Sequence, residues 1–155
     1  MRVDTIKVFT DGSCIDNPGL AGYGYVLFMD GKLYEVSEYM GVATNNQAEL
    51  GAIIDALEFI PGSRDVIVYT DATYIVRAFK SGWLRRWKTS NWKSHGRLIA
   101  NRPLWERLIK LTTKHRVEFF WVEGHAKSKW NNRADQLARL GSHENTCRTI
   151  SSYVG

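Results

Sequence analysis

The sequence predicts an α/β fold in which three antiparallel strands are followed by strands and helices that alternate along the chain. Its 155 residues are about the length of one domain. Three runs rich in β-branched and aromatic residues occur before Gly41. Beyond it the apolar residues adopt helical spacing, and two further apolar runs are separated by helical segments. Strands joined through a helix are parallel, so the sheet should be mixed.

Short connections link the first three strands. The strands are predicted over residues 5–10, 22–29 and 33–40. Asp30-Gly31, between the second and third runs, is a typical hairpin turn. Asn17-Pro18-Gly19 is a turn signal within the short connection over 12–21, which keeps the first two strands antiparallel. These segments therefore form a meander.

The long helix that follows has clear start and stop signals. Thr44 is its expected N-cap, Gln47 completes a capping box and Pro61-Gly62 ends it. Further strands are predicted over 66–70 and 117–122, and further helices over 72–79, 103–113 and 131–140. We expect one domain over residues 1–141, with residues 142–155, which are small and polar, forming a flexible tail.

Composition excludes several classes of protein. With 44% hydrophobic and 24% charged residues, the chain resembles neither a disordered nor a collagenous protein. No run approaches the roughly 20 apolar residues that span a bilayer, so we expect a cytoplasmic protein without membrane contact. We also expect a monomer. Cys14 and Cys147 are far apart and form no CxxC pair, which favours reduced thiols over a disulfide framework or a zinc site.

Positive charge is concentrated in one block. Residues 80–116 contain eleven Lys or Arg and a single acid, Glu106, within a chain of net charge +5. The same block holds four of the six tryptophans, which are Trp83, Trp87, Trp92 and Trp105. Cations alternating with aromatic rings suit phosphates and stacked bases. The alternative is a solvated helix face over core tryptophans, and for Trp105 we favour the core.

Four acids lie where they can face a common site. Asp11 and Asp71 end predicted strands, Glu49 shares the apolar stripe of the long helix, and Asp135 lies one turn before Ala138 in the last helix. Carboxylates without a nearby histidine pair or thiolate suit Mg²⁺ or Mn²⁺. Taken singly, each acid also has an ordinary structural explanation as a turn, helix-end or surface residue. His125, in a small-residue loop, can shuttle protons.

Five segments in order resemble the successive signatures of type 1 ribonuclease H. They are residues 9–13 (FTDGS), 44–50 (TNNQAEL), 69–71 (YTD), 121–125 (WVEGH) and 132–138 (NRADQLA). The resemblance implies a ribonuclease H-like fold, with a five-stranded mixed sheet flanked by helices. It also implies an endonuclease that hydrolyses the RNA strand of RNA/DNA hybrids with two Mg²⁺ ions, for which Mn²⁺ can substitute, leaving 5′-phosphate and 3′-hydroxyl ends.

Residue roles follow from the same resemblance. Asp11, Glu49, Asp71 and Asp135 are the implied metal-binding acids, and His125 is the loop residue that assists turnover. Residues 80–101 match a basic protrusion that contacts the DNA strand. Its implied contacts are Trp83, Arg85, Arg86, Trp87, Lys88, Trp92 and Lys93. Backbone and minor-groove contacts are implied for Asn17, Thr44, Asn45 and Asn46, with Cys14 contributing through its main chain.

The chain departs from the family pattern at two places. Ala72-Thr73 follow Asp71 where many members have Ser and a long polar residue, and Val42-Ala43 replace a polar or basic pair. Two rival functions share part of this pattern. An integrase-like or resolvase-like DNA endonuclease would share the sheet but lacks the basic Trp segment and the Gly-His loop. A catalytically silent hybrid-binding module would not need all four acids.

Overall fold

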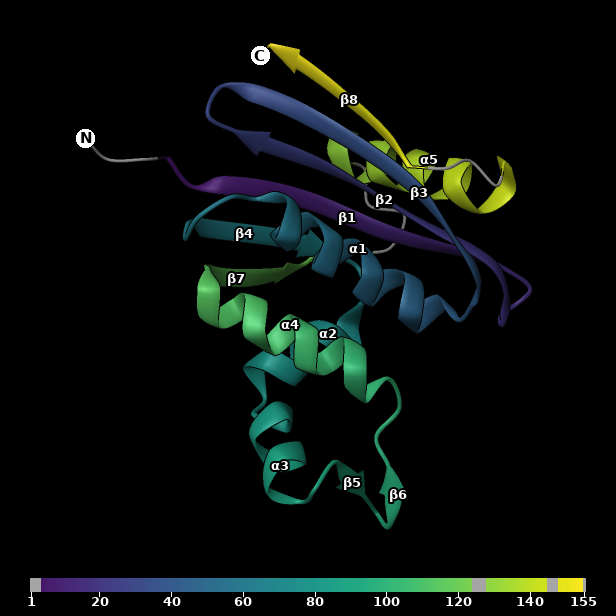
Figure 1. Ribbon diagram of the computed structural model, residues 1–155, viewed down its shortest axis with the longest axis vertical. Helices are drawn as coiled ribbons and strands as arrows, with labels where there is room; N and C mark the ends of the chain where they lie inside the picture. Colours follow the sequence, from purple (N-terminus) through teal and green to yellow (C-terminus); the bar gives the residue numbers. More distant parts are fainter. Residues whose placement is uncertain (1–3, 124–127, 145–147, 155) are drawn as a thin grey trace.

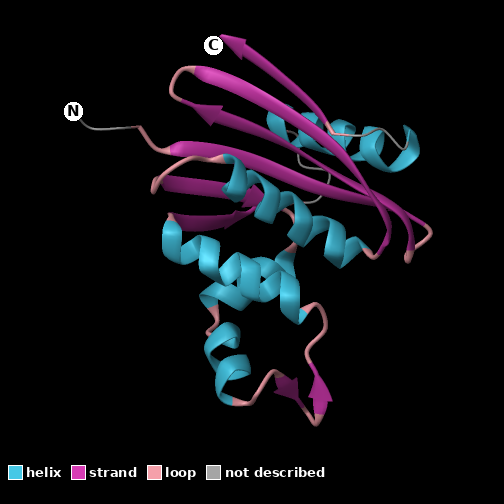
Figure 2. Ribbon diagram, viewed as in Figure 1, coloured by secondary structure: helices cyan, strands magenta, loops and turns pink. Residues whose placement is uncertain are grey.

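The computed structural model describes residues 4–123, 128–144 and 148–154. Three consecutive strands come first, and helices interspersed with strands follow (Figures 1 and 2). In chain order they are β1 (Ile6–Ile15), β2 (Gly19–Met29), β3 (Lys32–Ala43), α1 (Asn45–Phe59), β4 (Asp65–Thr70), α2 (Thr73–Lys80), α3 (Trp83–Thr89), β5 (Lys93–Ser94), β6 (Arg97–Leu98), α4 (Arg102–Lys114), β7 (Arg116–Trp121), α5 (Lys129–Glu144) and β8 (Thr149–Val154).

Within these residues, six strands form one mixed sheet in the order β7-β4-β1-β2-β3-β8. The predicted meander is confirmed, because β1 pairs antiparallel with β2 and β2 with β3. The predicted parallel strands are also confirmed, since β4 lies parallel to both β1 and β7. The α/β fold class therefore stands, with one strand more than the five expected. No helix in the described ranges is long and apolar enough to cross a membrane.

Helices cover both faces of the sheet (Figure 1). Consecutive residues of β2 show the two faces: a Cβ at Gly24 would lie 2.4 Å from the Leu137 side chain of α5, whereas the Tyr25 hydroxyl donates a 2.7 Å hydrogen bond to Asp55 of α1. Alternate residues of a strand point to opposite faces. The main hydrophobic core lies between the sheet and α1, where Leu50, Ile53 and Leu57 are fully buried.

The start of α1 forms as the sequence predicts. The Thr44 hydroxyl accepts a hydrogen bond from the Gln47 backbone N–H at 3.1 Å, and the Gln47 side chain accepts one from the Thr44 N–H at 3.0 Å. This reciprocal capping box satisfies two N–H groups that a helix otherwise leaves unpaired. It fixes the N-terminal turn of α1, which leads directly to Glu49.

The chain between α2 and α4 forms a protrusion, defined here as residues 80–101, that extends from the body of the molecule (Figure 1). The protrusion was expected from the sequence, but its helix and its hairpin were not. Trp83–Thr89 forms helix α3, and Lys93–Ser94 pairs with Arg97–Leu98 in a short hairpin. Trp105 is 2% exposed, which confirms its place in the core, and the Trp87 ring contacts it edge-on at 5.2 Å.

The C-terminal residues differ from the flexible tail expected over 142–155. Helix α5 continues to Glu144, and Thr149–Val154 pairs antiparallel with β3 as the edge strand β8. The physical reason is a long-range one: β3 offers a free row of backbone hydrogen-bonding groups, and Ile150, Tyr153 and Val154 favour extended backbone. The small polar residues that accompany them conceal this preference in the sequence.

Arg148 joins β8 to the core side of the sheet. One of its guanidinium nitrogens, Nη1, lies 2.9 Å from Glu38 Oε2 and 2.7 Å from Asp55 Oδ1. The other, Nη2, donates to the Tyr25 hydroxyl at 3.4 Å. Two partly buried carboxylates therefore share this one guanidinium, and its loss would leave both poorly compensated.

We expect Arg148→Ala to lower the free energy of unfolding by about 1–3 kcal/mol, because two partly buried acids lose their cation. Urea unfolding followed by circular dichroism measures this change. Arg116→Ala is the matched control, since its ion pair with Asp65 is long (3.9 Å) and exposed, and it should change stability by no more than about 0.5 kcal/mol. Equal effects of the two variants would contradict the role given to Arg148.

Candidate active site

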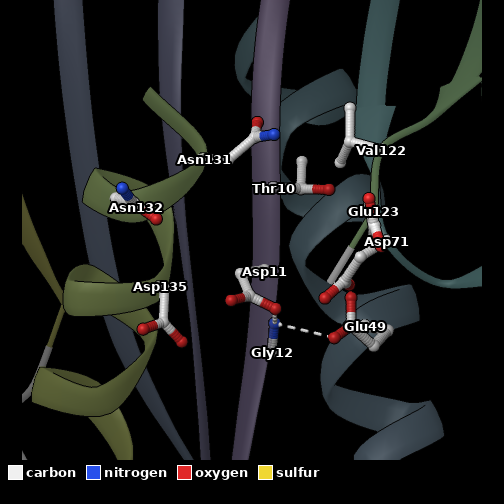
Figure 3. A pocket seen from close by; sticks show the side chains of 10 residues that line it. All are labelled: Thr10, Asp11, Gly12, Glu49, Asp71, Val122, Glu123, Asn131, Asn132 and Asp135. Carbon is white, nitrogen blue, oxygen red and sulfur yellow. Dashed lines mark hydrogen bonds between the residues drawn. The ribbon is translucent and has the colours of Figure 1, made fainter. Parts of the chain in front are cut away.

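Three of the four predicted acids meet at one place. Asp11 of β1, Glu49 of α1 and Asp71, which follows β4, each offer a carboxylate oxygen, and these oxygens lie within 4.8 Å of one another. Figure 3 shows the three side chains converging on one pocket. The lining residues are Thr10, Asp11, Gly12, Glu49, Asp71, Val122, Glu123, Asn131, Asn132 and Asp135.

Strand pairing explains why Asp11 and Asp71 are neighbours. The parallel pairing of β1 with β4 ends at Phe9 and Tyr69, and each acid lies two residues beyond its end. The carboxyl ends of parallel strands are where such sheets place ligands. Asp11 does not end its strand as expected, because β1 continues to Ile15 along β2 alone. It nevertheless lies just past the parallel portion of β1.

Gly12 brings Glu49 to the same point. A Cβ at Gly12 would lie 2.7 Å from the backbone of Ala48 and Glu49, so only glycine lets α1 approach β1 this closely. The Gly12 backbone N–H then donates to Asp11 Oδ1 at 2.9 Å and to Glu49 Oε1 at 3.2 Å (Figure 3). One N–H therefore holds two carboxylates beside each other.

One oxygen of this cluster lacks a partner. Glu49 Oε2 is buried and has no hydrogen-bond partner among the described residues. A buried carboxylate oxygen without a donor is costly unless a cation binds it. Three hard oxygen ligands and one unsatisfied oxygen therefore fit a divalent cation of the Mg²⁺ or Mn²⁺ type.

The electrostatics of the cluster reflect its crowding. Burial, and then the negative charge of Asp71, raises the pKa of Asp11 from 3.8 to about 7. Burial, together with the charges of Asp11 and Asp71, also raises the pKa of Glu49 well above its ordinary range. Like charges held close together disfavour full ionisation, and a bound cation would reverse that effect.

Asp135 and His125 complete the list of expected catalytic residues. Asp135 lies on α5 in the wall of the same pocket, but it is outside the three-carboxylate cluster and its carboxylate lies 3.2 Å from Arg139 Nε. The structure thus clusters three acids and places the fourth in the same pocket, close enough to Asp11 for Asp135 to raise the pKa of Asp11. His125 lies outside the described residues.

Asn131 and Asn132 line the pocket without having been singled out from the sequence. They precede Asp135 by one turn of α5 and lie across the pocket from Asp71 (Figure 3). The available signal was two adjacent amides just before an expected acid on one helix. Adjacent asparagines at a helix start are more simply explained as capping residues, which is why the pattern alone does not point to a site.

The polar residues expected to contact backbone and minor groove gather around the start of α1. Asn17 Oδ1 accepts a 3.0 Å hydrogen bond from the Asn45 N–H, which ties the β1–β2 turn to this helix. The Asn46 carbonyl accepts one from the Tyr74 hydroxyl at 2.8 Å, and Cys14 Sγ lies 3.2 Å from the Ala43 carbonyl. Asn17, Asn45 and Asn46 are exposed, and Thr44 is committed to the capping box.

The protrusion presents cations outward and aromatic rings inward. Arg85, Arg86, Lys88 and Lys93 are exposed. Trp92, an implied contact of the DNA strand, is only 5% exposed, because its ring lies tilted against Trp87 and beneath the Arg102 guanidinium. The tryptophans pack against one another, and Leu84 and Ile99 of the protrusion are also partly buried against the core. Its surface is therefore mainly cationic.

Known ribonucleases H are similar to this chain in sequence. The RNase H family model matches residues 4–143. A curated ribonuclease H from Chlorobaculum parvum is 43% identical over 141 residues, which span 90% of this chain and 97% of that protein. The chain belongs to the ribonuclease H family. It is therefore a nuclease that hydrolyses phosphodiester bonds.

Solved ribonuclease H structures share the fold. LC9-RNase H1, described as a type 1 RNase H with the type 2 active-site motif, superposes with a TM-score of 0.84 at 26% identity, covering 97% of this chain and 79% of that one. LC11-RNase H1, solved in complex with an RNA/DNA hybrid, gives a TM-score of 0.68 at 24% identity over 90% of this chain and 98% of that one. The latter likeness shows the fold alone.

Crowding of the acids predicts a stability effect. Without divalent metal, we expect Asp71→Asn to raise the melting temperature, because it removes a charge that opposes ionisation of Asp11 and Glu49. Two unit charges about 4 Å apart repel by up to about 4 kcal/mol at an effective dielectric near 20, so a gain of about 1–3 kcal/mol is expected. Thermal melts in EDTA measure it, and Mg²⁺ should stabilise the wild type more than the variant.

The pH dependence of the same melts has a defined sign. Folded Asp11 binds its proton more tightly than unfolded Asp11, so the folded state carries more protons between about pH 3.8 and about pH 7. The contribution of Asp11 to the free energy of unfolding of the metal-free wild type is therefore present below this pH range and is lost as the pH rises through it. Asp71→Asn should flatten this loss. A variant that melts lower than wild type in EDTA at pH 7 would contradict the repulsion.

Proposed function

We propose that this ribonuclease H is an endonuclease that cleaves the RNA strand of RNA/DNA hybrids with Mg²⁺. The observation that carries the proposal is the cluster of Asp11, Glu49 and Asp71 with its unsatisfied buried oxygen. It lies beside the asparagine-rich start of α1, and the same chain carries a cationic protrusion. A duplex that contacts all three would place a backbone phosphate over the acids.

Asp11, Glu49 and Asp71 would hold the metal, with Asp135 contributing from the wall of the same pocket. When bound, two Mg²⁺ ions lower the pKa of water and stabilise charge on the leaving oxygen of an in-line displacement. Gly12 keeps two of the carboxylates in place through its N–H. Mn²⁺, which also prefers oxygen ligands, should substitute.

Water is the proposed nucleophile, because the described wall of the pocket offers no free hydroxyl or thiol. Its one hydroxyl residue, Thr10, is 6% exposed and lies 3.4 Å from the Tyr69 carbonyl, to which it donates. Direct attack by water leaves a 5′-phosphate and a 3′-hydroxyl, with no covalent enzyme intermediate. By resemblance to the family, we assign His125 to assist turnover by moving a proton.

Recognition of RNA rests on the amides near α1. A 2′-hydroxyl exposed in a wide minor groove distinguishes RNA from DNA. Asparagine side chains both donate to and accept from such a hydroxyl. Asn45 and Asn46 are exposed within one turn of Glu49, and Asn17 is tied to them. The cations of the protrusion would then contact phosphates of the DNA strand.

Three labelled duplexes of one sequence test the proposal. The protein with Mg²⁺ should cut the RNA strand of the hybrid and leave duplex DNA and duplex RNA intact. Ligation of the products to a 3′-hydroxyl acceptor tests for the 5′-phosphate. Cleavage of duplex DNA would favour a DNA endonuclease with the same sheet, and binding of hybrid without cleavage would favour a silent binding module.

A further inference from the structure

Gln47, the third residue of α1, uses both ends of its side-chain amide. Its Oε1 accepts from the Thr44 N–H at 3.0 Å in the capping box. Its Nε2 donates to Asn101 Oδ1, also at 3.0 Å, although the two residues are 54 positions apart in the chain. The cap of α1 is thereby linked directly to the last residue of the protrusion.

Asn101 has given up its usual local partner to make this contact. It is the N-cap of α4, where asparagine normally accepts a hydrogen bond from the first turn and stabilises the helix by about 1 kcal/mol. Here its side chain makes no capping bond, and its backbone adopts a left-handed conformation with φ of 64°. The amide is directed toward α1 in place of α4.

The hydrogen bond between Gln47 and Asn101 lies where the protrusion joins the body of the molecule. The protrusion leaves the body after Lys80 and returns at Asn101, so Asn101 lies at one of the two places where its chain joins the body (Figure 1). The first turn of α1 is already bound to the β1–β2 turn through Asn17 and to α2 through Tyr74. Gln47 adds the protrusion as a third segment fixed to that turn.

We propose that Gln47 and Asn101 form a positioning pair that sets the protrusion relative to the start of α1, so that one duplex contacts both surfaces at once. This inference rests on the proposed function, since it concerns how the hybrid is held. The pair lies outside the carboxylate cluster. Its loss should weaken hybrid binding and leave the chemical step unchanged, because fixing both surfaces in advance reduces the entropic cost of binding.

An exchange of donors and acceptors tests the pair. Gln47→Glu keeps the capping-box acceptor, and rotation of the Asn101 amide lets it donate to the new carboxylate. Asn101→Asp gives Gln47 Nε2 a carboxylate to donate to. Each single variant thus retains one hydrogen bond across the pair. Only the double variant places two acceptors face to face with no donor.

The KM for the hybrid in the double variant should exceed the product of the two single effects by about threefold or more. Its kcat should stay within about twofold of wild type. The double variant should remain folded at the assay temperature, so that unfolding does not account for the higher KM. Added negative charge alone would multiply the single effects and give no excess, which would overturn the proposal. So would an excess that appears in kcat instead of KM.

An uncharged cycle provides an independent check. Asn101→Gly preserves the left-handed backbone while removing the amide, and Gln47→Met removes the donor at similar size. If the pair acts through its hydrogen bond, either single variant already removes it. The double variant should then bind the hybrid with the same affinity as the single variant that binds it more weakly. Strictly multiplicative losses would contradict the coupling. Failure of the wild type to bind hybrid at all would instead overturn the proposed function, and this inference with it.

Discussion

Replacing Asp11 or Asp71 by Asn, or Glu49 by Gln, should reduce Mg²⁺-dependent cleavage of the hybrid by about 1000-fold or more. Each change preserves shape and removes one charge from the three-carboxylate cluster. Loss of about 4 kcal/mol of transition-state stabilisation corresponds to that factor, and metal-assisted charge stabilisation is worth several kcal/mol. Single-turnover cleavage of a labelled hybrid measures the rate, and hybrid binding should change by less than about threefold.

Asp135→Asn should be milder, because Asp135 lies outside the three-carboxylate cluster and an amide oxygen can still act as a ligand. Asp65→Asn is the matched control, since it removes an exposed acid at the opposite end of β4. It should retain wild-type cleavage. Near-normal turnover by Asp71→Asn would contradict the assignment of the site.

Neutralising Arg85, Arg86 and Lys88 together, as Gln, should raise the KM for the hybrid and flatten its dependence on salt. These side chains are exposed on α3 of the protrusion. Each phosphate contact releases counterions and contributes about 0.9 to the slope of log affinity against log salt, so three contacts contribute up to about 2.7. Titrations over a range of salt concentrations measure the slope, and kcat should change less than KM.

A second triple variant separates position from charge. Lys110, Lys114 and Arg116 belong to the same basic block and are exposed, but they lie near the end of α4 and the start of β7, outside the protrusion. Their replacement by Gln removes the same charge. It should leave most of the salt slope intact, whereas equal slopes for the two variants would show that net charge alone controls binding.

The sequence was sufficient for the features that local chemistry determines. The meander follows from turn residues such as Asp30-Gly31, and the start of α1 follows from Thr44 and Gln47. The three clustered acids were predictable because strand ends and an apolar helix stripe have few ways to place a carboxylate. For the turn and the helix start, the signal and the structure that it specifies lie within a few residues.

Features that depend on distant partners were not predictable. Strand β8 forms only because β3 presents a free edge more than 100 residues earlier in the chain. Asp135 lies in the same pocket and raises the pKa of Asp11, but helix periodicity gives only the face on which it lies and does not show that it stands outside the cluster of Asp11, Glu49 and Asp71. Trp92 was expected at the surface, and its burial depends on packing with Trp87 within the protrusion.

Direct binding of Mn²⁺, followed by its electron paramagnetic resonance signal, tests most directly the claim that Asp11, Glu49 and Asp71 form a metal site. The wild type should bind Mn²⁺, Mg²⁺ should displace it, and Asp65→Asn should bind as the wild type does. Glu49→Gln should bind Mn²⁺ about tenfold more weakly or worse, because it removes the negative charge of the carboxylate to which the unsatisfied oxygen Oε2 belongs. Equal Mn²⁺ affinity of the wild type and Glu49→Gln would contradict the account.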